Sequence, residues 1–214
     1  MRTRIKPGRI AGFLAQMMLL LAPTVSLAEV CANTIQADVV AIDQQIVHNR
    51  LGAFNPISMI FALRQDVVNA ANGLTEAEGG ILTPGNVRLR DDKRPRPLVL
   101  RVNEGDCLRI SFQNLLAPTP LVLPPDAAGE FAGQPATRHV GMAIMGVSFA
   151  DMVSSGVNVG NNPVSGYAAP GETKEYLVRG EHEGGYHINS IADNVSGEGI
   201  QGQTSFGLFG ALNV

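Results

Sequence analysis

Apolar side chains occupy every second position in two short segments, 98–102 and 108–112. The positions are Leu98, Leu100 and Val102 in the first segment and Leu108, Ile110 and Phe112 in the second. Because side chains point alternately to the two faces of a strand, this pattern predicts two half-buried strands. Glu104-Gly105-Asp106 between them predicts a tight turn, and the whole segment is typical of a β-sandwich.

Other segments repeat this organisation of short strands between glycine and proline turns. Strands are predicted over 37–47, around Tyr176 and Val178, over 138–149, and from Phe206 to the end of the sequence. Residues 56–64 could form a further strand or a buried arm, and 66–74 has helix-compatible spacing. With no internal repeat and no strong helical amphipathicity, the chain is predicted to be an all-β sandwich.

The segment from Gly184 onward carries the most specific pattern. In Tyr186-His187-Ile188-Asn189-Ser190, period-two alternation places Tyr186, Ile188 and Ser190 on one face and His187 and Asn189 on the other. A loop rich in glycine follows, and the chain closes with an apolar segment that begins Gly207-Leu-Phe-Gly-Ala. This arrangement predicts two adjacent strands joined by a sharply bent loop.

The first 28 residues resemble an export signal. Four cations precede an apolar stretch over 10–22, and Ser26-Leu27-Ala28 places small residues where a signal peptidase cleaves. A membrane anchor is the alternative, but the apolar stretch is short and Pro23 interrupts it. We therefore expect cleavage after Ala28, a single domain over 29–214, and a periplasmic or extracellular location.

Removal of that signal changes the charge. The remaining chain has 12 Lys and Arg against 19 Asp and Glu, a net charge of −7. An acidic surface disfavours nucleic acid and anionic lipid as partners. With 45% hydrophobic residues, the 214-residue chain can build a substantial core.

Cys31 and Cys107 are the only two cysteines. In an exported chain such a pair predicts a disulfide, which would stabilise the fold by about 4 kcal/mol in the chain-entropy model. The alternative is a free thiolate that binds copper.

These segments resemble the N-terminal cupredoxin (plastocyanin-like) domain of multicopper oxidases. The resemblance rests on Tyr186-His187-Ile188-Asn189, on Gly207-Leu-Phe-Gly-Ala, and on Val102-x-x-Gly105-Asp106-x-Leu108-x-Ile110. It covers about residues 37–214 and implies a Greek-key β-sandwich of the cupredoxin type. It also implies copper ligands, which the family places in a Tyr-His-Ser-His strand and in an earlier His-x-His-Gly motif.

In this register Asn189 stands in place of the second histidine of the strand, and Ala143 and Met145 stand in place of the histidines of the earlier motif. Of the expected imidazoles only His187 remains. A slipped register could instead make His139, four residues before Ala143, a ligand. Met142, Met145 and Met152 could hold Cu(I), although methionines of this kind also fill cores.

The resemblance therefore implies an exported cupredoxin-like domain that has lost most of its copper ligands. We expect a binding or structural module without oxidase activity of its own, or a part of a larger oxidase-like assembly with further cupredoxin domains or another protein partner. Two alternatives stay open: a copper-binding oxidoreductase domain that acts with partner domains, and a periplasmic module that binds copper through methionine and histidine.

Overall fold

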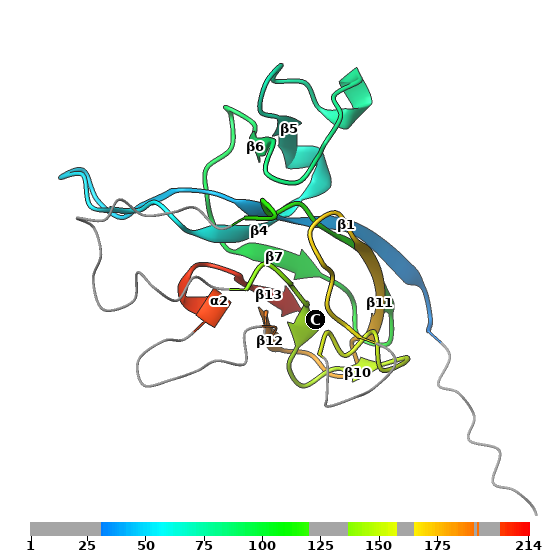
Figure 1. Cartoon of the computed structure of the whole chain (residues 1–214). Coiled ribbons are helices and arrows are strands. Elements are labelled where there is room, and N and C mark those ends of the chain that lie inside the picture. The colour runs from blue at the N-terminus through cyan, green and yellow to red at the C-terminus, as the bar shows by residue number, and fades with distance from the viewer. Residues whose placement is uncertain (1–30, 120–136, 158–164, 191, 193–201) are drawn as a thin grey trace, which may run out of the picture. The chain divides into compact units, whose positions relative to one another are not determined.

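The structure is a computed structural model that describes residues 31–119, 137–157, 165–190, 192 and 202–214. The predicted export signal over 1–28 lies outside these residues. Two sheets face each other (Figure 1), and the chain crosses between them repeatedly. The predicted all-β, Greek-key sandwich is confirmed. None of the described helices has the length and apolarity that crossing a membrane needs.

The larger sheet has five strands in the order β10-β11-β8-β1-β4. Their bounds are Ser148–Phe149 (β10), Thr173–Arg179 (β11), Cys107–Asn114 (β8), Thr34–Asp43 (β1) and Met59–Leu63 (β4). β1 runs parallel to β8, and the other neighbours are antiparallel. β4 therefore forms one edge of this sheet.

The smaller sheet has four strands in the order β7-β13-β12-β9. Their bounds are Leu98–Arg101 (β7), Phe209–Asn213 (β13), Gly185–Asn189 (β12) and Ala143–Ile144 (β9). Two small ribbons lie apart from these sheets, and they pair β2 (Ile46–Val47) with β3 (Phe54–Asn55) and β5 (Val67–Asn69) with β6 (Val87–Leu89). The helical turns are η2 (Arg64–Asp66), η3 (Glu76–Glu78) and α2 (Gly202–Ser205).

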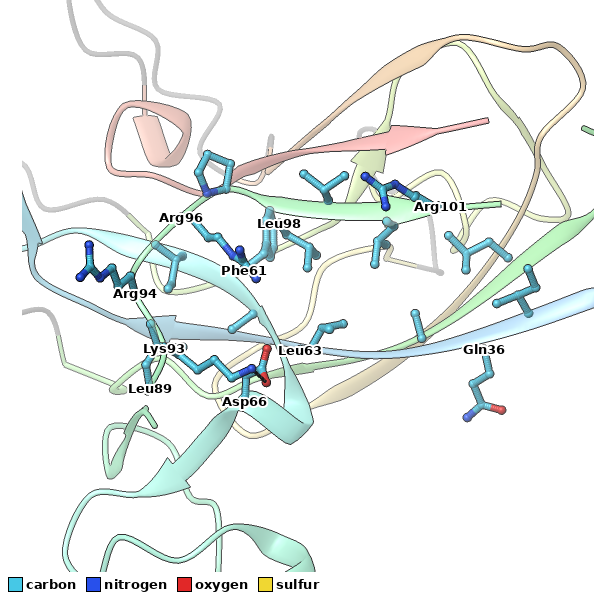
Figure 2. A pocket seen from close by; sticks show the side chains of 18 residues that line it. Gln36, Phe61, Leu63, Asp66, Leu89, Lys93, Arg94, Arg96, Leu98 and Arg101 are labelled. Carbon is cyan, nitrogen blue, oxygen red and sulfur yellow. Dashed lines mark ion pairs between the residues drawn. The ribbon is translucent and has the colours of Figure 1, made fainter. Parts of the chain in front are cut away.

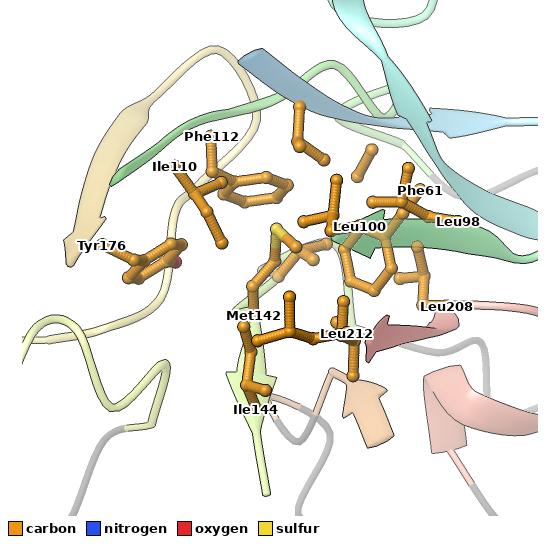
Figure 3. Packing of buried hydrophobic residues seen from close by; sticks show 14 of the residues in the cluster. Phe61, Leu98, Leu100, Ile110, Phe112, Met142, Ile144, Tyr176, Leu208 and Leu212 are labelled. Atoms are coloured by element: carbon orange, nitrogen blue, oxygen red, sulfur yellow. The ribbon is translucent and has the colours of Figure 1, made fainter. Parts of the chain in front are cut away.

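The main core fills the space between the sheets (Figure 3). The alternation over 98–112 is borne out, because β7 and β8 bury the predicted side chains although the two strands belong to opposite sheets. Tyr176 and Val178 are also buried, as predicted. The Tyr176 hydroxyl donates to the carbonyl of Gly166 at 2.6 Å, and burial raises the pKa of this phenol.

β1 and β4 are buried on both faces. Val39 and Phe61 point into the main core, whereas Val40, Ile42 and Ile60 belong to a second cluster on the outer side of the sheet. Residues of the β5–β6 segment complete that cluster, and Figure 1 shows this segment over the outer side of β1 and β4. Strands buried on both faces have continuous apolar sequences, as in Met59–Leu63.

Two local expectations differ from the structure. Residues 66–74 do not form a helix, because Val67–Asn69 pairs with β6 and Asn69 begins a turn by accepting hydrogen bonds from the amides of Ala71 and Asn72. The strand expected over 138–149 is reduced to β9 and β10, which join different sheets. Here tertiary pairing overrides the local pattern.

The disulfide between Cys31 and Cys107 is present, with the two Cα atoms 5.4 Å apart. Asp106, beside it, is almost fully buried. Its carboxylate accepts hydrogen bonds from the amide nitrogens of Asn33 at 3.0 Å and Asn103 at 3.1 Å. The Asn33 bond, followed by the Asn103 bond, holds the pKa of Asp106 below its usual 3.8. The charged carboxylate of Asp106 thus connects Asn33, which follows Cys31, to Asn103 before the turn between β7 and β8.

The Asp106→Asn variant tests this role. A lowered folded pKa means that the carboxylate stabilises the fold above its unfolded pKa and loses this effect as the pH falls through the folded value. We expect a lower melting temperature at pH 7 and a smaller further decrease below pH 4 than in the wild type. Thermal melts across pH 2–7 measure both. The exposed Asp38 supplies the control Asp38→Asn, and equal acid sensitivity of all three proteins would contradict the prediction.

Gly156 lies where the chain passes beside β9. It has a φ of +69°, and a Cβ atom there would come within 2.1 Å of the carbonyl oxygen of Met142. Both the conformation and the close approach require glycine at this position. The contact fixes the turn against the free edge of β9.

Alanine substitutions distinguish the cost of the close contact at Gly156 from the cost of its positive φ. We expect Gly156→Ala to lower the free energy of unfolding by more than about 2 kcal/mol, because backbone atoms must move. Gly52, with a φ of +91° and nothing within 4 Å, is the matched control, and Gly52→Ala should cost only about 1 kcal/mol. Chemical denaturation measures both values. Equal losses would show that only the backbone conformation matters.

Candidate functional site

The outer face of the smaller sheet is where the predicted ligand positions meet. In β12, Ile188 points into the core and is fully buried, so His187 and Asn189 point to the opposite side. We call this side the open sheet face and define it by Val99, Ala143, Met145, His187, Asn189, Phe209 and Ala211. The side chains of β12 alternate between this face and the core as the sequence predicts.

The pairing of β9 with β12 brings four of these residues together. Asn189 is the direct partner of Ala143. One step along, the amide of Met145 donates to the carbonyl of His187 at 3.0 Å, so these two residues also lie opposite each other. The positions that correspond to the family's ligands therefore gather at one place on the open sheet face.

The donor set at this place does not fit a copper cluster. It offers one imidazole (His187), one thioether (Met145) and one carboxamide (Asn189), while Ala143 offers no lone pair. Copper centres of this kind need several imidazole or thiolate donors at fixed geometry. Within the described part of the chain, no three His, Cys, Asp or Glu side chains are grouped so that they could hold a metal ion.

The carboxamide of Asn189 has an unpaired oxygen. Its Oδ1 atom is shielded from solvent and has no hydrogen-bond partner among the described residues. An unpaired buried amide oxygen costs about 1–3 kcal/mol. Met145, by contrast, is 58% exposed, and Phe209 and Val99 are also partly exposed on the same face. The face thus combines an unpaired acceptor with uncovered apolar side chains.

A buried polar network fixes the end of β12. The fully buried Gln203 donates through Nε2 to the carbonyls of Thr137 at 2.6 Å and His139 at 2.7 Å, and its Oε1 accepts from the hydroxyl of Ser190. The Ser190 hydroxyl also accepts from the amide of Gly141. The alternation in the sequence places Ser190 on the same face as Ile188, but no sequence signal indicates Gln203 as its partner.

Arg138 positions the segment before β9. Its guanidinium donates to both carboxylate oxygens of Asp43 at 2.6 Å and to the carbonyl of Ala117 at 2.7 Å. Its own carbonyl accepts from Asn114, which is fully buried. These contacts join β9 to the ends of β1 and β8, and no local sequence signal indicated them.

The other candidate residues lie elsewhere. His139 is exposed and precedes β9. Figure 3 shows Met142 in the core, near Leu100, where it is 1% exposed. Met152 is 50% exposed in a turn after β10. The structure therefore places Met145, but not Met142, beside His187.

No family model and no curated protein matches the sequence. Similar solved structures include a multi-copper oxidase from Pseudomonas thermotolerans (18% identity, TM-score 0.45) and a copper nitrite reductase from Nitrosomonas europaea (16% identity, TM-score 0.46). Each similarity covers 85% of this chain, but only 29% and 41% of those chains. The chain thus spans less than half the length of either. Similarity this low carries no activity, substrate or metal to this chain.

The register of β9 and β12 can be tested by adding an imidazole. In Met145→His, the new side chain would lie opposite His187 at an exposed position, and two facing imidazoles bind Cu²⁺ better than one. We expect at least a tenfold gain in Cu²⁺ affinity by titration calorimetry. Met152 is similarly exposed, so Met152→His is the control and should give no such gain. Equal affinity of the two variants would contradict the register.

Proposed function

We propose that this chain is an exported, cupredoxin-like module that performs no copper redox chemistry by itself and serves as a structural or binding part of a larger oxidase-like assembly. The observation that carries the proposal is the donor set of the open sheet face, where Ala143, Met145 and Asn189 accompany a single histidine. These residues occupy the strand positions of a copper site but do not offer the imidazole ligands that copper needs.

The properties of this face support contact with another domain. Met145 and Val99 are at least half exposed, although the sheet around them is regular. Apolar side chains that share one exposed face mark surfaces that other protein parts cover. The unpaired Oδ1 of Asn189 is shielded from solvent, so the contact would rest on the apolar side chains. The neighbour that fits is a folded domain with an apolar surface.

A second candidate function rests on the pair of Met145 and His187. A thioether and an imidazole on facing positions are soft donors that suit Cu(I). The chain would then be a periplasmic copper-binding module. Among the described residues this alternative has two protein donors, because Met142 points into the core, and we therefore favour the module without redox chemistry.

Metal content separates the two candidates. The purified chain is loaded with Cu²⁺, or with Cu(I) under reducing conditions, and then desalted and analysed by atomic emission and electron paramagnetic resonance. We expect much less than one copper per chain, and no difference between the wild type and His187→Ala. One retained copper that both His187→Ala and Met145→Leu abolish would overturn the proposal in favour of the copper-binding module.

A further inference from the structure

β1 extends past the end of β4, so part of it has a strand on one side only. β4 ends at Leu63, which lies opposite Val39, whereas β1 begins at Thr34. Figure 2 shows β4 turning away near Leu63 while β1 continues to Gln36. On its other side this part of β1 pairs with β8. We call the side opposite β8, over residues 34–37, the β1 edge.

The backbone groups of Thr34 and Gln36 point to the β1 edge. The carbonyl of Asn33 accepts a hydrogen bond from the amide of Cys107, at the start of β8. Because the N–H and C=O groups of successive residues alternate between the two sides of a strand, Thr34 and Gln36 point away from β8. Among the described residues, no hydrogen bond engages the N–H or C=O of either residue.

This edge is exposed and has none of the usual protection against pairing. Thr34 and Gln36 are exposed, and Ile35 is 38% exposed. Proteins protect edge strands with charged side chains, proline or a bulge. Residues 34–37 contain no charge and no proline, and β1 pairs with β8 without a bulge from Thr34 to Ala41. Such an edge is a template for another strand.

Two grooves beside the β1 edge leave space for an added strand. One, of about 600 Å³, lies toward β7, and the other, of about 570 Å³, lies toward η3. Gln36, Ala37 and Leu63 line both grooves, so the two spaces meet where β4 ends. A strand added in line with β4 would direct its side chains alternately into the two grooves.

The side chains of β1 indicate which strand fits. Ala37 packs against the main core, so Ile35 also faces inward, whereas Thr34 and Gln36 face outward. A matching strand has an inward apolar side chain between two outward, uncharged polar side chains. Thr34-Ile35-Gln36 of a second copy has this pattern. Antiparallel pairing centred on Ile35 places Thr34 opposite Gln36 of the second copy, with no like charges facing each other.

The residues before Thr34 are held away from the β1 edge. The disulfide between Cys31 and Cys107 fixes them on the β8 side. The amide of Ala32 also donates to the carbonyl of Gly105, in the turn before β8, at 3.0 Å. Residues 31–33 of each copy are therefore directed toward their own β8 and not toward the space beyond β4.

We propose that two copies of this chain associate through the β1 edge, with residues 34–36 paired antiparallel across a two-fold axis. Thr34 of one copy and Gln36 of the other exchange backbone hydrogen bonds in both directions, and the two Ile35 side chains pack against each other. The larger sheets of both copies then form one continuous sheet. This inference goes beyond the proposed function, because it concerns the edge of the larger sheet and a second copy of the same chain.

Cysteine cross-linking tests the register of this pairing. The Cα atoms of the two Ile35 residues would lie about 4.5 Å apart, within the range that a disulfide spans. Under mild oxidation, Ile35→Cys should form covalent dimers that non-reducing electrophoresis detects. Leu51, 95% exposed in the turn between β2 and β3, supplies the control Leu51→Cys, which reports random collisions and should give little dimer. Equal yields from the two variants would overturn the proposal.

Sedimentation equilibrium tests the association without an added thiol. A short paired edge gives a weak dimer, so we expect the wild type to dimerise with a Kd of about 10 µM to 1 mM. Gln36→Pro removes an N–H from the β1 edge, and it leaves the pairing with β8 intact because Gln36 donates no hydrogen bond to β8. Ile35→Lys places two like charges opposite each other. Each variant should raise the Kd at least about tenfold.

Circular dichroism verifies that both variants are folded, and Ile35→Lys decides the outcome if proline disturbs β1. A wild type that stays monomeric up to about 1 mM would overturn the proposal. A dimer whose Kd is unchanged in the folded variants would also overturn it, because the association would then use another surface. None of these results depends on copper content, so they are independent of the proposed function.

Discussion

Burial of β1 and β4 on both faces is the constraint on which the rest of the structure depends. Their inward side chains need the smaller sheet, and their outward side chains need the β5–β6 segment. Removing either cover would expose several large apolar side chains, each of which contributes about 1.5–3 kcal/mol when buried. The long connection between β4 and β7 is therefore part of the core, although its sequence resembles a loop.

The same constraint shapes the surfaces beside β7. The β5–β6 segment covers the outer face of β4 but does not pair with its edge, and a groove of about 600 Å³ lies between that edge and β7. On the smaller sheet no described segment covers Met145, which remains more than half exposed. Val99 belongs both to the groove and to the open sheet face, so the two surfaces are contiguous.

Side-chain contacts fix the strand ends on either side of His187. Gln203 and Ser190 fix the end of β12, and Arg138 fixes the segment before β9. None of these contacts involves Ala143, Met145, His187 or Asn189. The sheet is therefore regular at this place, and the oxygen of Asn189 stays unpaired among the described residues.

Alternation along a strand follows from covalent geometry alone, so the sequence was sufficient to assign the inward side chains of β7, β8 and β11 and the opposite faces of Ile188 and His187. It also predicted the disulfide and the meeting of Ala143 and Met145 with β12, the latter through family motifs. It did not reveal the partner of Ser190, the ion pair between Arg138 and Asp43, or the shortness of β9. Those depend on residues 13 to 95 positions apart in the chain that only folding brings together, because pairing across such distances is a choice among many chain closures.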